Sequence, residues 1–156
     1  MTYYLDTNIV IFMLFNEDLT KNLHQTTRRL FQDGNNKFVI SSIAFRELID
    51  IYKSDYCQPE IKTGKQSAKK KGPGINQYKN INEVYEAIGN IGIKIIPFGE
   101  HHVKMYETLT FHKDNKDWND RFIVSQAIAD KLTIISSDTD FEHYVSQGLK
   151  LFFNKR

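Results

Sequence analysis

Short apolar runs alternate with longer helical segments along most of the chain. Runs rich in β-branched and aromatic residues predict strands at 3–5, 37–40, 93–96, 132–135 and 149–153. Segments with apolar residues three and four positions apart predict helices at 9–15, 19–31, 43–52, 81–89, 100–109 and 120–130. Strands that alternate with helices form a parallel sheet covered by helices on both faces. The predicted fold class is therefore α/β, with three layers.

Size and composition indicate one folded domain over residues 1–156. A chain of this length buries about 68–70% of its unfolded surface, so its core is stable without disulfides or structural metal ions. The single cysteine, Cys57, excludes an internal disulfide framework and a cysteine-rich zinc site. The apolar run Ile9–Phe15 is far shorter than the ~20 residues of a membrane span, and no basic leader precedes it. We therefore expect a cytoplasmic protein without a membrane partner.

One basic segment, Lys53–Lys79, interrupts the alternating pattern. It contains prolines and glycines, has no apolar period, and carries seven lysines against two acidic residues, a local charge of +5. Because the whole chain has a net charge of +2, the remainder is −3. A flexible basic loop at about 53–79 can be a plain solvated connection or can bind RNA phosphates through counterion release. The second interpretation predicts contacts from Lys69, Lys70 and Lys71.

Acidic residues stand at the ends of the predicted strands and near helix starts. Asp6 follows the first strand and Asp138 follows the fourth, while Glu47 and Asp120 lie in the first turns of two helices. Taken singly, each carboxylate is more often a solvated group or a helix cap. In parallel sheets, however, ligands bind beyond the carboxyl ends of the strands. If the four converge, cations must offset their repulsion, and oxygen-only ligands suit Mg²⁺ or Mn²⁺ near a phosphate.

Four motifs in order carry a resemblance to a known family. They read YLDTN at 4–8, SSIAFREL at 41–48, DRFIVSQA at 120–127 and TIISSDTDF at 133–141. Together they resemble the PIN domain, and most of all the VapC-type ribonuclease toxins of bacterial toxin–antitoxin pairs. The resemblance implies a central parallel sheet between helices and a Mg²⁺- or Mn²⁺-dependent endoribonuclease that cleaves RNA. It also implies an antitoxin partner, and it is compatible with a homodimer.

The resemblance also implies roles for individual residues. The catalytic carboxylates fall on Asp6, Glu47, Asp120 and Asp138, of which Asp6, Asp120 and Asp138 would bind the metal. Supporting positions fall on Asn8, which would orient Asp6, on Ser41, which would line the site, and on Asp140. Arg121, next to a predicted ligand, is a candidate contact to RNA.

One departure from the family pattern leaves the third carboxylate open. The family segment often reads Asp-Pro-x-Asp-Arg shortly after a histidine, whereas this chain has Asp117-Trp118-Asn119-Asp120-Arg121. Asp117 therefore stays an alternative ligand to Asp120. Trp118 could stack on a base, but a lone tryptophan is more often partly buried, so packing is favoured for it.

Other functional classes fit less well. A haloacid-dehalogenase-like phosphatase would need a second aspartate where Asn8 stands. A receiver domain would need an aspartate after the third strand and a lysine after the fifth, and those places hold Pro97 and Asn154. A catalytically inactive PIN-like RNA-binding module stays open, although all four acidic positions being filled argues against lost activity.

Overall fold

The computed structural model describes residues 1–15, 19–56, 78–111 and 117–155, with only the backbone of 54–56. Its strands are β1 (Thr2–Leu5), β2 (Lys37–Ser41), β3 (Ile93–Ile96), β4 (Thr133–Ser136) and β5 (Lys150–Phe153). Its helices are α1 (Thr7–Phe15), α2 (Gln25–Gln32), α3 (Ser42–Tyr56), α4 (Ile81–Asn90), α5 (Glu100–Thr108), α6 (Trp118–Ala129) and the 3-10 helix η2 (Thr139–Gln147).

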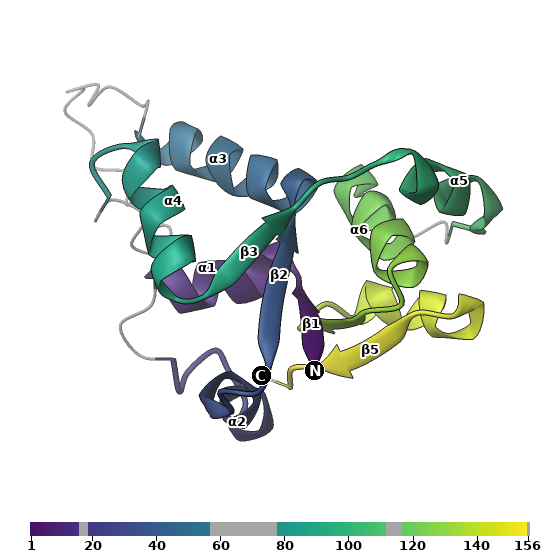
Figure 1. Cartoon of the computed structure of the whole chain (residues 1–156), viewed down its shortest axis with the longest axis horizontal. Coiled ribbons are helices and arrows are strands. Elements are labelled where there is room, and N and C mark those ends of the chain that lie inside the picture. The colour runs from purple at the N-terminus through teal and green to yellow at the C-terminus, as the bar shows by residue number, and fades with distance from the viewer. Residues whose placement is uncertain (16–18, 57–77, 112–116, 156) are drawn as a thin grey trace, which may run out of the picture.

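The five strands form one parallel sheet in the order β3-β2-β1-β4-β5 (Figure 1). The first strand of the chain therefore lies at the centre, where Tyr4 pairs with Val39 of β2 on one side and Ile134 of β4 on the other. All carboxyl ends point to the same edge of the sheet. Because β1 and β4 are neighbours, the segments that follow them, with Asp6 and Asp138, start side by side.

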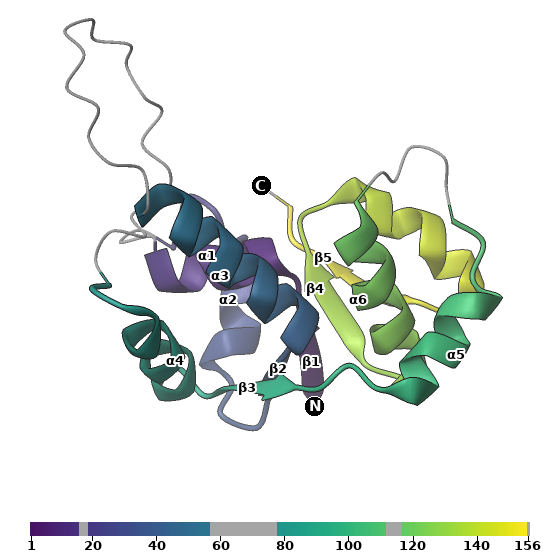
Figure 2. The same cartoon turned by 90° about the horizontal axis from the view of Figure 1, so that it is seen from above.

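Helices cover both faces of this sheet. In Figure 2, α1 to α4 lie on one side of β1, and α5 and α6 lie on the other. The centre of the sheet is fully buried, with Tyr4, Leu5, Ile40 and Ile134 each at 0% exposure. An apolar surface on nearly all sides is typical of a helix held between layers, and α1 (TNIVIFMLF) is such a helix. The predicted three-layer α/β fold is thus confirmed.

The helix predicted at 19–31 is shorter than expected, because α2 begins only at Gln25. The carboxamide of Asn154, just after β5, accepts the backbone N–H of His24 at 2.9 Å and donates to the carbonyl of Asn22 at 2.9 Å. His24 then caps α2 by accepting the N–H of Thr26. These bonds hold the preceding turn out of the helix, and their partner lies 130 residues away in sequence.

The predicted basic loop also starts later than expected, because α3 continues to Tyr56. Residues 57–77, with Lys69, Lys70 and Lys71, lie outside the described residues. Within the described stretches, no helix has the length and apolar character that crossing a membrane requires.

Candidate active site

Asp6 is the most deeply buried carboxylate of the predicted cluster. It follows β1 directly and is 3% exposed. Its Oδ2 accepts the hydroxyl proton of Ser136, the last residue of β4, at 2.8 Å. Burial raises the pKa of Asp6 to about 6, the hydrogen bond from Ser136 opposes that rise, and the charges of Glu47 and Asp138 add to it. The Asp6 carboxyl is therefore shielded from water and lies near the carboxyls of Glu47 and Asp138.

Glu47 reaches the same place from the first turns of α3. Thr7, which opens α1, donates its hydroxyl to Glu47 Oε2 at 2.6 Å. Burial raises the pKa of Glu47, whereas the bond from Thr7 lowers it and the charge of Asp117 raises it again. Because Thr7 follows Asp6 in the chain, this bond fixes Glu47 beside the end of β1.

Asp120 enters from the first turn of α6 and is half-buried. Burial raises its pKa to about 8, and the charges of Asp6, Asp117, Asp138 and Glu47 follow in that order of effect. Each of the other predicted catalytic carboxylates thus lies close enough to act on Asp120. The structure brings the four together at the carboxyl edge of the sheet; their roles as ligands stay a prediction.

Asp117 has a different place from Asp120. It is exposed and is the N-cap of α6, where its Oδ1 accepts the backbone N–H of Asn119 at 2.8 Å. Capping satisfies a helix-terminal N–H group and adds a negative charge at the positive end of the helix dipole. The geometry thus favours Asp120 over Asp117 as the third carboxylate of the cluster. Asp117 caps the helix that carries Asp120.

Asp138 is likewise the cap of a helix. Its Oδ1 accepts the N–H of Asp140 at 2.9 Å, and its own N–H donates to the Ser136 hydroxyl at 3.0 Å. Ser136 therefore ties Asp138 to Asp6 through one oxygen. Asp140 lies one position into η2 and is half-buried.

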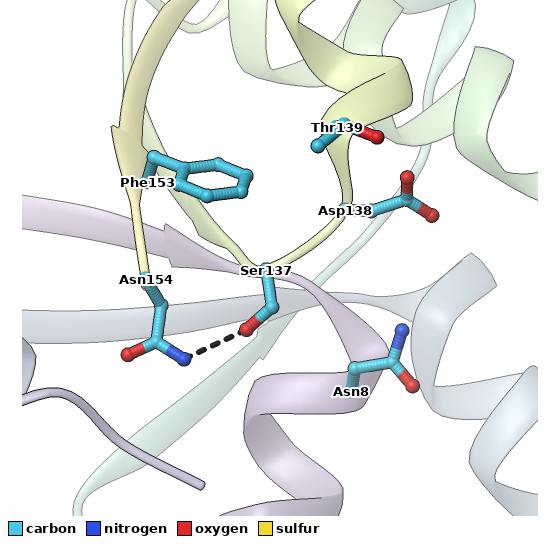
Figure 3. Close-up of a pocket in the computed structure, with 6 residues that line it drawn as sticks. All are labelled: Asn8, Ser137, Asp138, Thr139, Phe153 and Asn154. Carbon is cyan, nitrogen blue, oxygen red and sulfur yellow. Dashed lines mark hydrogen bonds between the residues drawn. The ribbon is translucent and has the colours of Figure 1, made fainter. Parts of the chain in front are cut away.

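Two supporting residues lie where the sequence did not lead us to expect them. Ser41 is fully buried, and its Oγ donates to Gln126 Oε1 at 2.7 Å and accepts the N–H of Ile43 at 3.0 Å, so it does not line an open site. The described residues contain no hydrogen bond between Asn8 and Asp6, whose Oδ2 is bonded by Ser136. The side chain of Asn8 is exposed and, with Asp138, lines a pocket (Figure 3).

Gln126 is a buried polar residue on which four parts of the fold meet. It projects from α6, and its Oε1 accepts the hydroxyl protons of Ser41 and of Tyr4, at 2.7 and 3.1 Å. Its Nε2 donates to the carbonyl of Pro97, just after β3, at 3.1 Å. Sequence reasoning missed Gln126, Thr7 and Ser136; the signal for Thr7 and Ser136 was a hydroxyl one position after Asp6 and another two positions before Asp138.

Aromatic rings surround the predicted RNA contact Arg121. Its guanidinium lies 4.7 Å from the ring centroid of Trp118 and 4.8 Å from that of Phe111, as in cation–π pairs. Trp118 is 64% exposed, so the expected packing of this residue was wrong. Nearby, Arg46 bonds both Asp50 and Asn119, which fastens α3 to the first turn of α6.

A second group of side chains could bind a metal ion by its spacing, because His101, His102 and Asp130 place ligand atoms within 4.8 Å of one another. In the described residues none of the carboxylates above belongs to so tight a group. However, His102 Nδ1 accepts the N–H of Gly99 at 2.8 Å, so its proton sits on Nε2 and is donated to Asp130 at 3.1 Å. Both nitrogens are committed, and the cluster joins α5 to the end of α6, about 15 Å along the helix from Asp120.

Comparisons with known proteins agree with the fold. The model of the PIN domain family matches residues 3–146, and a search of curated proteins gives no match. Among solved structures, VapBC2 from Rickettsia felis bound to a DNA fragment from its promoter is 20% identical, over 99% of this chain and 100% of that chain, with a TM-score of 0.58.

Two further complexes are similar. DNA-bound VapBC from Salmonella typhimurium is 16% identical over 98% of both chains, with a TM-score of 0.62. A toxin–antitoxin complex from Klebsiella pneumoniae is 16% identical over 89% of both chains, with a TM-score of 0.54. At such identities the likeness establishes a shared fold.

Proposed function

This chain belongs to the PIN-domain family, and from that premise we propose that it is a metal-dependent endoribonuclease and the toxin of a toxin–antitoxin pair. One observation carries the proposal. Carboxylates from the end of β1, from α3, from α6 and from the end of β4 meet at one edge of the sheet, where burial and then the charges of neighbouring carboxylates raise the pKa of Asp6 and of Asp120. Such a charge arrangement opposes folding unless a cation or protons neutralise it. A local arrangement that lowers stability is typical of a functional site.

The donor chemistry fits a hard divalent cation. The cluster offers only carboxylate oxygens, and these suit Mg²⁺ or Mn²⁺. Asp6, Asp120 and Asp138 would hold the ion. When bound, it would lower the pKa of a water molecule and neutralise charge on the phosphodiester under attack.

Residues of the chain would orient and move the proton. Ser136 fixes one oxygen of Asp6, and Thr7 occupies Oε2 of Glu47, which leaves Glu47 Oε1 for a water molecule. Because burial raises the pKa of Glu47 toward the working pH, this carboxylate is suited to accept the proton of an attacking water. Arg121 would face the RNA, and Lys69, Lys70 and Lys71 would bind phosphates farther along the strand.

The partner follows from the same premise. The similar structures are VapBC or toxin–antitoxin complexes, and a ribonuclease that attacks cellular RNA has to be held inactive. We therefore propose a cognate antitoxin that covers the carboxylate edge in the cytoplasm, and a homodimer as the form that binds it.

The test is RNA cleavage with Mg²⁺, with Mn²⁺ and with EDTA, by the wild type and by Asp6→Asn. We expect cleavage only with metal, and we expect Asp6→Asn to bind RNA without cleaving it. A matched control is Glu142→Gln, which neutralises an exposed carboxylate on η2 outside the cluster. Binding without cleavage by the wild type would instead identify an inactive RNA-binding module, and cleavage that persists in EDTA would refute the metal site.

A further inference from the structure

A pocket of about 330 Å³ continues the carboxyl edge of the sheet from Asp138 toward β5 (Figure 3). Its size falls in the range of small-ligand sites. The residues that line it come after β1, after β4, or at and just after the end of β5: Asn8, Ser137, Asp138, Thr139, Phe153 and Asn154. It therefore adjoins the carboxylates, and a strand of RNA that reaches Asp138 would pass over it.

Asn154 makes one wall of this pocket rigid. It is fully buried, and its Oδ1 accepts the N–H of His24 at 2.9 Å and the hydroxyl of Thr27 at 2.8 Å. Its Nδ2 donates to the carbonyl of Asn22 at 2.9 Å and to Ser137 Oγ at 2.7 Å. The Asn154 carboxamide has thus used both donors and both acceptor sites, and it supports the wall without binding a ligand.

Ser137 lines the same pocket and can donate its hydroxyl proton to a ligand there. Its oxygen accepts the proton of Asn154 Nδ2, so the Ser137 hydroxyl proton is left to point elsewhere. Asn8 and Thr139 are exposed on the same pocket, and no hydrogen bond of their side chains occurs within the described part of the chain. The half-buried ring of Phe153 extends from β5 toward the loop that carries Ser137 and Thr139 (Figure 3).

We propose that this pocket binds the base of a nucleotide next to the cleaved bond, stacked on Phe153 with its edge bonded by Asn8 and Ser137. This inference rests on the proposed ribonuclease function. An aromatic ring beside an amide and hydroxyls is the usual means of holding an unpaired base, because the ring takes the face and the amide offers both a donor and an acceptor to the edge. Asn8 is then a residue that sets base preference.

The chemistry of the lining disfavours two other occupants. A phosphate would need a cation, and among the described residues the pocket lining includes Asp138 but no lysine or arginine. An arginine from a protein partner could pair with Asp138, but it carries only donors, so it would leave the donor of the Ser137 hydroxyl without an acceptor and would find the acceptors of Asn154 already used. A base carries both kinds of group and no charge, so it fits best.

The test measures the dissociation constant of a single-stranded oligoribonucleotide in the Asp6→Asn background, where the RNA stays intact. Phe153→Leu keeps an apolar side chain but loses the stacking face, and we expect about 5- to 100-fold weaker binding, whereas Phe153→Trp should bind as well as the parent. Tyr85→Leu, an exposed aromatic on α4, is the matched control and should leave binding unchanged.

A second arm changes the RNA instead of the protein, so it does not depend on the folding of a variant. A single abasic nucleotide is moved along the oligonucleotide. At one position beside the cleaved bond, the abasic nucleotide should weaken binding to Asp6→Asn by the same factor as the Phe153→Leu substitution does. In the protein that already carries Phe153→Leu, the same abasic nucleotide should not weaken binding further. In the cleaving protein, Asn8→Ala should reduce the preference for particular bases at that position.

Three outcomes separate the possibilities. If the wild type cleaves RNA but Phe153→Leu binds every oligonucleotide as the parent does, the pocket proposal is overturned and the proposed function stands. If Phe153→Leu weakens the complex with the antitoxin and leaves RNA binding unchanged, the pocket takes a peptide and the proposal is also overturned. If the wild type neither binds nor cleaves RNA, the proposed function fails, and the pocket proposal fails with it.

Discussion

Asp120→Asn should make the metal-free protein more stable, although it removes a predicted ligand. At pH 7 the unfolded carboxyl, with its ordinary pKa of 3.8, is ionised, whereas the folded one, with a pKa of about 8, is mostly protonated. The interval from 3.8 to 7 corresponds to about 4 kcal/mol of destabilisation, at about 1.4 kcal/mol per pH unit. Asparagine keeps part of the burial cost, so we expect recovery of about 1–2 kcal/mol, or a rise in Tm of roughly 2–8 °C.

The sign of the pH dependence follows from the same shift. Between pH 3.8 and 8 the folded state binds more protons at Asp120 than the unfolded state does, so stability must fall as the pH rises through that window. In EDTA, the wild type should lose Tm between pH 5 and 8 more steeply than Asp120→Asn. Millimolar Mg²⁺ should raise the Tm of the wild type at pH 8 and have little effect on the variant.

The assay is thermal unfolding followed by circular dichroism, at several pH values, with EDTA or with Mg²⁺. Glu142→Gln is the control for loss of one exposed negative charge and should stay within about 0.5 kcal/mol of the wild type. If Asp120→Asn is no more stable than that control at pH 8 in EDTA, the carboxylates do not repel one another as we argue.

Three further variants test separate contacts. Ser136→Ala removes the hydrogen bond that favours the ionised form of Asp6, so the pKa of Asp6 should rise further. The concentration of Mg²⁺ that gives half of the maximal Tm increase should then be several-fold higher than for the wild type. Gln126→Leu leaves the hydroxyls of Tyr4 and Ser41 without their acceptor and should cost about 2–4 kcal/mol in urea unfolding, with an unchanged m-value. Asn80→Ala removes the cap of α4 and should cost about 1 kcal/mol in the same assay.

The convergence of Asp6 and Asp138 could be predicted from sequence because it depends only on topology. Each follows a short apolar strand, and parallel strands direct their carboxyl ends to one edge. The helices that carry Glu47 and Asp120 were visible from their apolar spacing, so four acidic positions could be placed within a few residues. What the pattern could not decide was which of Asp117 and Asp120 turns inward, because that depends on where α6 begins.

Features that depend on distant side chains were missed. The turn before α2 is held by Asn154, and the burial of Ser41 follows from a glutamine 85 residues later. Trp118 is exposed because it lies in the first turn of α6, beside its N-cap, with Arg121 against its ring. Local propensity contains no information on such partners, so these positions became clear only when α6 and the segment after β5 were in place.

The central position of β1 sets the moment at which the site can exist during synthesis. β1 pairs with β4, which follows it in the chain by about 130 residues and is therefore made later. Ser136 and Asp138 arrive with β4, so a growing chain has neither the partner of Asp6 nor the fourth carboxylate until β4 has been made. At about 5–20 residues per second, the cluster stays incomplete for several seconds after β1 is made, and in the proposed ribonuclease this delay would protect the RNA nearest to the nascent chain.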